Sequence, residues 1–171
     1  MTLLPDSLVL RGPRVTLRPS SEDDVDALVA LLAEPGVRRW WRENTADDVR
    51  QELRVGLTVF DEDDQVAGWL LVHEETEPEY PSVAFDIAVS DRLRGRGYGQ
   101  ETLRVLLAHC IAAGHHRFTI DPAIDNDRAI RSYAAVGFKP VGVLREQELW
   151  EDGRWGDALL MDLLAREVSW E

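Results

Sequence analysis

This 171-residue sequence has one cysteine, Cys110, few prolines and no long apolar run. A single cysteine excludes a disulfide framework, and its place on the inner face of an expected helix predicts a small buried thiol. The lack of about 18 consecutive apolar residues argues against a membrane-spanning helix. With 8 prolines and 44% hydrophobic residues, the composition is typical of a globular chain and not of a disordered one.

The length and the first residues favour one cytoplasmic domain. A chain of this length can bury a core of its own, and we expect a single domain over residues 1–171. Residues 1–10 are few and include Pro5 and Asp6, so we expect no secretory signal. These features predict a cytoplasmic protein without a membrane partner.

Positive charge is also scarce. The sequence has 19 Lys and Arg residues against 32 Asp and Glu, which gives a formal net charge of -13. Such a surplus of acid argues against nucleic acid as a partner and favours a cationic ligand. The four histidines show no spacing with the cysteine that is typical of a metal site, so we predict no metal.

Strand-like and helix-like segments follow one another along the chain. Alternation of apolar and polar residues predicts strands at 14–19, as a hairpin within 57–74, at 82–90, at 117–122 and as a closing pair within 141–165. Helical spacing and capping residues predict helices at 20–34, 45–53 and 126–138, and a long helix that follows the glycines and ends near Gly114. This order favours a mixed α/β domain built on one sheet.

The segment "RLRGRGYGQ" (92–100) stands between an expected strand and an expected helix. Its three glycines, Gly95, Gly97 and Gly99, would let backbone N–H groups converge on an anion at the positive end of the helix dipole. Arg94 and Arg96 add positive charge to the same place. The segment therefore predicts a phosphate or pyrophosphate ligand.

Two common nucleotide motifs do not fit this segment. A Walker loop requires Lys and then Ser or Thr after its last glycine, whereas Gln100 and Glu101 follow here. The glycines are spaced G-x-G-x-G, so the dinucleotide pattern G-x-G-x-x-G is missing as well.

The pattern R-x-x-G-x-G, formed by Arg94, Gly97 and Gly99, resembles that of the GCN5-related N-acetyltransferase (GNAT) family. The segment "NDRAIRSYAAVGF" also resembles a family signature, through Asn126, Ala129, Tyr133, Gly137 and Phe138. With the strand before the glycines, the strand after the long helix and the residues up to Gly142, these motifs cover residues 82–142. The resemblance implies the GNAT fold, in which a central mixed, mostly antiparallel sheet is flanked by helices and splays into a V between its two central strands.

The resemblance also implies acetyl-CoA as the acetyl donor, lying in the V. Backbone groups of Ile87, Ala88 and Val89 would face its pantetheine arm. The pyrophosphate would lie on the loop made by Arg94, Gly95, Arg96, Gly97, Tyr98 and Gly99. Asn126 either contacts the cofactor arm or simply caps the helix that follows it.

Three residues are candidates for the chemistry of acetyl transfer. By resemblance Tyr133 would be the general acid that protonates the departing thiolate; the alternative is a core aromatic. Asp86 lies in the apolar strand "VAFDIAV", where a carboxylate is costly unless it is paired or faces a wet cleft, and it could bind and deprotonate an ammonium group. Asp121 has a similar position in "FTIDP"; an exposed strand face or a structural hydrogen bond is the alternative for both aspartates.

Within the family the chain most resembles the aminoglycoside 6'-N-acetyltransferases. The resemblance rests on Trp40 and Trp41 after the first expected helix, on an acidic loop, and on Asp86 and Asp121, which would hold a cationic acceptor. The two tryptophans could equally be core, lid or dimer contacts. The closing segment, however, resembles equally the ribosomal-protein N-terminal acetyltransferases.

The sequence therefore predicts an acetyl-CoA-dependent N-acetyltransferase that acts on a primary amine of a small polycation, with the 6'-amine of an aminoglycoside as first candidate. A polyamine or a protein N-terminus is the alternative acceptor. A non-catalytic acyl-CoA-binding module is the rival from another class, and the pair Tyr133 and Asp86 argues against it. Both a monomer and a homodimer are compatible with the sequence.

Overall fold

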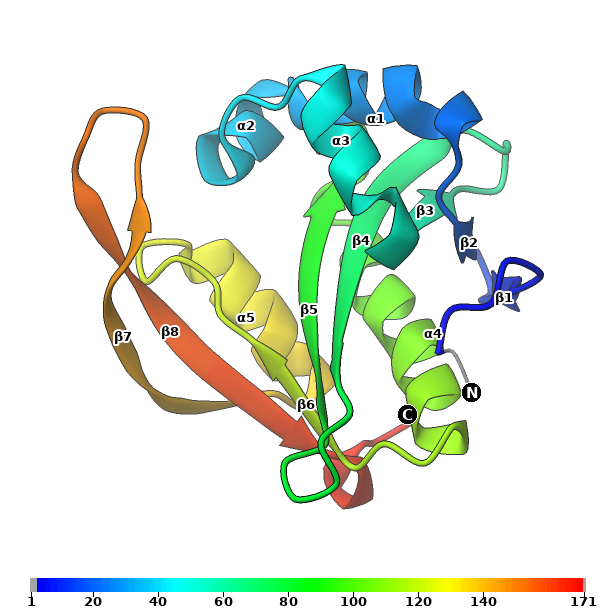
Figure 1. The fold of residues 1–171 in the computed structure, drawn as a ribbon, viewed down its shortest axis with the longest axis vertical. Helices are drawn as coiled ribbons and strands as arrows, with labels where there is room; N and C mark the ends of the chain where they lie inside the picture. Colours follow the sequence, from blue (N-terminus) through cyan, green and yellow to red (C-terminus); the bar gives the residue numbers. More distant parts are fainter. Residues whose placement is uncertain (1–2, 171) are drawn as a thin grey trace.

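A computed structural model describes residues 3–170 and shows one mixed sheet with helices on both of its faces (Figure 1). The strands are β1 (Leu10–Arg11), β2 (Thr16–Pro19), β3 (Gly56–Phe60), β4 (Val66–Glu75), β5 (Ser82–Val89), β6 (Arg117–Ile120), β7 (Lys139–Leu149) and β8 (Trp155–Leu164). The helices are α1 (Val25–Leu32), α2 (Pro35–Trp41), α3 (Ala46–Glu52), α4 (Tyr98–Ala112) and α5 (Asp127–Val136). Short 3-10 turns lie at Glu22–Asp24, Leu53–Val55, Asp91–Leu93 and Ala165–Glu167.

The strand order is β1-β2-β3-β4-β5-β6-β8-β7, and β5 with β6 is the parallel pair in an otherwise antiparallel sheet. β5 and β6 are paired only at Val83–Phe118 and Ala84–Thr119, after which they separate. The residues that follow β6 continue alongside β8, where the Leu159 N–H donates a hydrogen bond to the Pro122 carbonyl at 2.9 Å. The predicted V is confirmed, and Figure 1 shows its two arms leaning apart.

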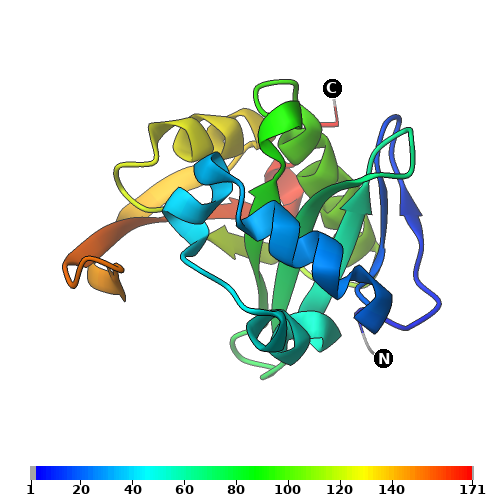
Figure 2. The same ribbon diagram turned by 90° about the horizontal axis from the view of Figure 1, so that it is seen from above.

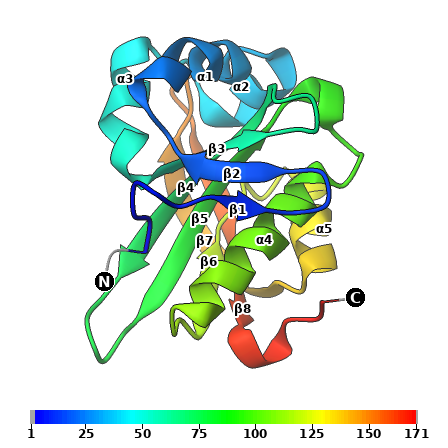
Figure 3. The same ribbon diagram turned by 90° about the vertical axis from the view of Figure 1, so that its right-hand side faces the viewer.

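Two hydrophobic cores lie on opposite faces of the sheet, and the period of two in β4 divides its residues between them. Leu70 and Val72 pack into the core that includes residues of α4, while Trp69 and Leu71 pack against α1, α2 and α3. Figure 3 shows these three helices at the top of the view, away from α4 and α5. In β5 the same alternation directs Ile87 and Val89 to the α4 side and Asp86 with Ala88 to the α2 side.

Most of the predicted elements are present, with small differences at their ends. The helix expected at 20–34 begins as a 3-10 turn and ends at Leu32, because Pro35 starts a separate helix, α2, that the sequence analysis did not predict. The two-residue strand β1 was also not predicted. Cys110 is fully buried as expected, and burial raises the pKa of its thiol to about 12.

The β7–β8 hairpin projects from the body of the molecule on the side where α2 lies (Figure 2). The family motifs end early in β7, yet β8 pairs with β6 along four residues of the same sheet. Among the helices of residues 3–170, none has both the length and the apolar character that crossing a membrane requires. Within the same residues, no three His, Cys, Asp or Glu side chains are grouped as a metal site.

Candidate active site

The glycine segment forms a tight loop that leads into α4. Gly95 and Gly97 adopt left-handed backbone angles, with φ of 76° and 83°, which only glycine adopts without strain. Gly99 has another reason to be glycine, since a Cβ there would lie 3.2 Å from Cγ2 of Val89. The first N–H groups of α4 have no partner inside the helix, so the loop and the helix start form a site for an anion.

A cavity of about 670 Å³ lies where β5 and β6 separate, and nearly all the predicted site residues line it. They are Trp40, Trp41, Asp86, Ile87, Ala88, Val89, Arg94, Gly95, Gly97, Tyr98, Gly99, Asp121, Asn126 and Tyr133. Arg96 is the exception, since it is not among the lining residues and its guanidinium lies 5.7 Å from the ring centre of Tyr98.

Tyr98 can meet a ligand only through its backbone. The residue is 4% exposed, and its hydroxyl donates a hydrogen bond to Glu62 at 2.7 Å. Arg14 lies over the same ring, 4.4 Å from its centre. The side chain of Tyr98 therefore fixes the start of α4 to the β3–β4 turn.

The glycine end of the cavity also carries two arginines that sequence reasoning missed. Arg128 and Arg131 of α5 line the cavity together with Arg94, whose guanidinium pairs with Asp91 at 2.7 Å. Partial burial and the positive charge of Arg94 lower the pKa of Arg128. The signal was available in "NDRAIRSY", where both arginines flank the family motif residue Ala129.

Asn126 both caps α5 and faces the cavity. Its Oδ1 accepts a hydrogen bond from the Ala129 N–H at 3.2 Å, which is the expected N-cap contact. Because it also lines the cavity, its two predicted roles are compatible with each other.

Tyr133 of α5 lines the cavity, near Asp86 and Asp121. Its ring packs against Phe138 edge to face, with the ring centres 6.4 Å apart. Burial raises the pKa of its phenol, and the negative charges of Asp86 and Asp121 raise it further. The phenol therefore carries its proton at neutral pH.

The end of the cavity opposite the glycines is acidic. Asp86 of β5, Asp121 after β6 and Glu148 of β7 all line it. Burial raises the pKa of Asp121 and of Glu148, and the charge of Asp86 adds to both. Three carboxylates that repel one another in a partly buried space would be stabilised by a bound cation.

Glu148 was missed because the strand that carries it is irregular. The β7–β8 register shifts between Leu144 and Glu148, and Glu146 has a positive φ of 52°. An irregular strand defeats the rule that alternate residues share a face. Gln147 donates to Asp121 at 3.4 Å and joins the hairpin to the end of β6.

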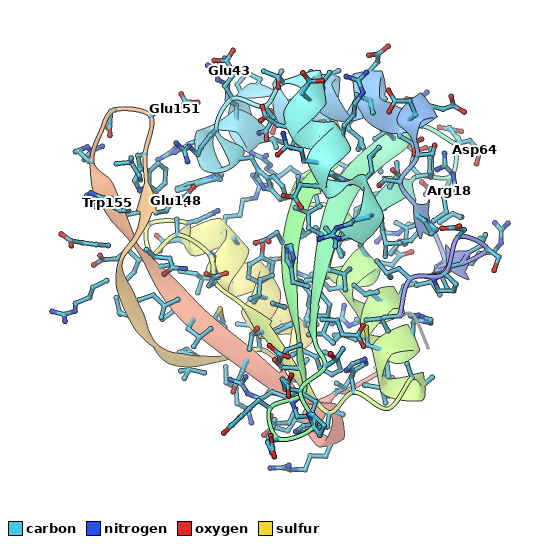
Figure 4. The ribbon with its side chains drawn as sticks, viewed as in Figure 1. Arg18, Glu43, Asp64, Glu148, Glu151 and Trp155 are labelled. Atoms are coloured by element: carbon cyan, nitrogen blue, oxygen red, sulfur yellow. The ribbon has the colours of Figure 1, made fainter. Side chains whose placement is uncertain are left out.

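The tip of the β7–β8 hairpin contacts α2 and the loop that follows α2, beside this acidic end. Trp40 meets Trp150 edge to face with ring centres 5.8 Å apart, and the Glu43 N–H donates to Glu151 at 2.6 Å. Figure 4 shows Glu43 and Glu151 close together, with Glu148 lower on the hairpin. Trp41 instead packs on Trp69, 6.0 Å away, so the two tryptophans have different surroundings.

Comparison with known proteins agrees with this architecture. Residues 14–139 match the family model described as "Acetyltransferase (GNAT) domain", which covers well over half of the chain. The chain belongs to the GNAT acetyltransferase family and is an acyltransferase. Acetyltransferases of this family use acetyl-CoA.

Individual relatives are distant. The "Uncharacterized N-acetyltransferase YycN" of Bacillus subtilis is 26% identical over 85 residues, and this match spans 49% of the chain and 54% of the relative. A ribosomal-protein-S5-alanine acetyltransferase from Vibrio fischeri superposes with a TM-score of 0.80 at 14% identity, over 95% of this chain and 100% of that chain. A spermidine N-acetyltransferase from Vibrio cholerae, in complex with CoA and spermine, gives 0.76 at 20% identity, over 91% and 98%. At these identities the structural likeness concerns the fold.

Proposed function

We propose that this protein transfers the acetyl group of acetyl-CoA to a primary amine of a small polycation, with the 6'-amine of an aminoglycoside as first candidate. The observation that carries the proposal is one cavity with an anion-binding loop at one end, three carboxylates at the other and a protonated phenol near the carboxylates. We also propose that the chain forms a single domain, since β7 and β8 extend the same sheet beyond the family match. The cytoplasm remains the proposed location. Residues 1–2 and 171 of the expected domain lie outside the described residues.

The glycine end fits a CoA pyrophosphate. A side chain at Gly95, Gly97 or Gly99 would occupy or distort the space in front of the helix start, and Arg94 and Arg128 supply positive charge. Beyond Ala84, the edge of β5 that faces β6 has no strand partner. The backbone groups of residues 86–89 on that edge are therefore free to bond the amides of a pantetheine arm.

Two residues of the chain would then transfer the protons: one takes a proton from the acceptor amine and the other gives a proton to the thiolate. Acetyl-CoA supplies the activated acyl group, and the amine must lose its proton before it can attack. Asp86 would bind the acceptor ammonium and take this proton, directly or through water. Tyr133, whose phenol carries a proton at neutral pH, would donate it to the thiolate as the thiolate departs.

The acceptor end favours a small acceptor over a peptide. At this end the α2 region and the β7–β8 hairpin contact each other, through Trp40 with Trp150 and Glu43 with Glu151. These contacts close the end of the cavity, whereas a peptide acceptor would need an open groove. The carboxylates of Asp86, Asp121 and Glu148 suit an acceptor with more than one ammonium group, and the net charge of -13 would attract it.

A polyamine is the second candidate acceptor. The spermidine acetyltransferase named above has this fold and was solved with spermine, and the same three carboxylates would suit a linear polycation. Transfer to a protein N-terminus has support from the likeness to the Vibrio fischeri enzyme, but the joined α2 and hairpin argue against an extended peptide.

The test is CoA thiol release by the purified protein with kanamycin-type aminoglycosides, polyamines and short peptides as acceptors. We expect turnover on a polycation that falls by about 10²-fold or more in Asp86→Asn, as for loss of a general base. Asp26→Asn, an exposed aspartate on α1, is the matched control and should keep full activity. Acetylation of peptides alone would contradict the polycation proposal, and binding of acetyl-CoA without turnover on any amine would favour the non-catalytic module.

A further inference from the structure

His73 on β4 lies next to Asp86 on the neighbouring strand. The β4–β5 register places Leu71 opposite Asp86 and His73 opposite Ala84, so both side chains project from the same face of the sheet. Nε2 of His73 is 3.4 Å from Oδ2 of Asp86. This distance is that of a close charge pair, slightly longer than an ideal hydrogen bond.

The two residues differ in what they can reach. Asp86 lines the cavity, whereas His73 is not among its lining residues. The His73 side chain is 47% exposed and that of Asp86 50% exposed. Asp86 therefore lies between the cavity and the imidazole, and the imidazole is open to solvent.

Among the described residues, the titratable neighbours that line the cavity beside Asp86 are acidic. Asp121 and Glu148, which face it there, are carboxylates, and Tyr133 keeps its own proton. The ion pairs of residues 3–170 give Asp86 one basic partner, which is His73. A proton taken from the acceptor could return to water through this imidazole without passing the acceptor again.

We propose that His73 is a positioning residue that orients Asp86 and carries the acceptor's proton from Asp86 to solvent. This inference rests on the proposed function, because it concerns the proton that an ammonium acceptor must lose. His73 would not touch the acceptor and would act only through Asp86.

The protons balance over one turnover. Asp86 takes one proton from the ammonium nitrogen, passes it to neutral His73, and His73 releases it to water. The neutral amine then forms the new N–C bond as the C–S bond breaks, and its second proton goes to the CoA thiolate through Tyr133. One proton is released for each amide formed.

The surroundings of His73 define its pH dependence. Pairing with Asp86 raises the pKa of His73 above its ordinary 6.5, partial burial opposes the shift, and the charge of Glu52 from α3 adds to it. Because only the neutral imidazole can accept a proton, activity should rise with pH through this raised pKa. The acid limb of kcat/KM would therefore report His73.

The first experiment compares His73→Gln and His73→Ala with wild type on whichever polycation is acetylated. Gln keeps an N–H that can hold Asp86 but cannot relay a proton. We expect kcat to fall about tenfold in both variants, which is less than is usual for a group that contacts the substrate. Both variants should also lose the acid limb of the pH profile near neutral pH. Added imidazole should partly restore the activity of His73→Ala. His116→Gln, an exposed histidine in the α4–β6 loop, should match wild type.

Full activity with an unchanged pH profile in His73→Gln would overturn the relay alone. Absence of wild-type turnover on every amine would overturn the proposed function and the relay with it. A second measurement needs no acceptor: an NMR titration of the His73 ring in wild type and in Asp86→Asn. The pKa should fall toward 6.5 in the variant, and an identical titration in both proteins would overturn the pairing.

Discussion

The glycine end of the cavity and its acidic end differ in chemistry and in construction. The glycine end presents backbone N–H groups and arginines, and most of it comes from residues 87–99 and the start of α5. The acidic end presents carboxylates and tryptophans that come from α2, β5, the end of β6 and β7. One end is thus made by local backbone geometry, the other by side chains that only the fold brings together.

This difference indicates how specificity is divided. A loop built from backbone can recognise a phosphate with little help from particular side chains, so many sequences can share it. An end built from side chains on separate elements changes whenever one of them is substituted. Donor recognition should therefore survive substitutions at the acidic end, and the converse should also hold.

Substitution of Tyr133, which lines the same cavity, should have the largest effect on kcat. Tyr133→Phe removes the proton donor and leaves the ring, so we expect kcat to fall by roughly 10²-fold or more with little change in acetyl-CoA affinity. Thiol release and a binding titration would measure the two quantities. Tyr80→Phe is the control, because that side chain is 74% exposed in the β4–β5 loop. Full turnover in Tyr133→Phe would remove the assignment of the acid.

Asp121→Asn and Glu148→Gln test the acidic end. Each should raise the KM for a polycationic acceptor by about tenfold, the order expected for a charged hydrogen bond, and leave the KM for acetyl-CoA unchanged. Glu79→Gln, an exposed loop glutamate, should change neither constant. An equal rise in both constants would show that the two ends are not independent.

The same carboxylates predict a pH dependence of acceptor binding. Burial and the charge of Asp86 raise the pKa of Asp121, so as pH falls this carboxylate loses its charge earlier than an ordinary aspartate. Acceptor affinity should therefore weaken as pH falls through that raised pKa. In Asp86→Asn the weakening should move to lower pH, because the neighbouring negative charge is gone; calorimetry at several pH values would measure it.

Gly97→Ala tests the glycine end. The left-handed φ of 83° costs about 1–2 kcal/mol for a residue with a Cβ, and relief of that strain would shift the loop. We expect the KM for acetyl-CoA to rise by about fivefold to tenfold, a lower thermal midpoint and an unchanged acceptor KM. Gly142→Ala is the matched control, since its Cβ would meet open space. A change in acceptor KM alone would contradict this division.

The smallest effect is expected where the hairpin meets α2. A Cβ at Gly156 would collide with the ring of Trp150 and push it away from Trp40. Since an aromatic pair contributes about 0.5–1.5 kcal/mol, Gly156→Ala should raise the acceptor KM by roughly threefold. Trp155→Phe on the same hairpin, at a side chain 57% exposed, should have no effect. Identical kinetics in both variants would show that this contact does not shape the acceptor site.

Local patterns sufficed to predict the elements that place the donor. The caps of α3 and α5, the glycine stops at Gly114 and Gly137 and the positive φ of the glycine loop all depend on neighbours in sequence, and each is present. Asp86 is half-exposed, lines the cavity and pairs with His73, so its position is compatible with both the functional and the structural interpretation that the sequence left open.

What the sequence alone determined about this protein is the glycine loop, its flanking strand and helices, and the family they define, because these depend on contacts between residues close together in the chain. The tertiary structure alone decided that Arg96 stays off the cavity, that Glu148 enters it past an irregular part of β7, and that His73 pairs with Asp86 across two strands. Those positions depend on strand register and on the separation of β5 from β6, which no local pattern encodes.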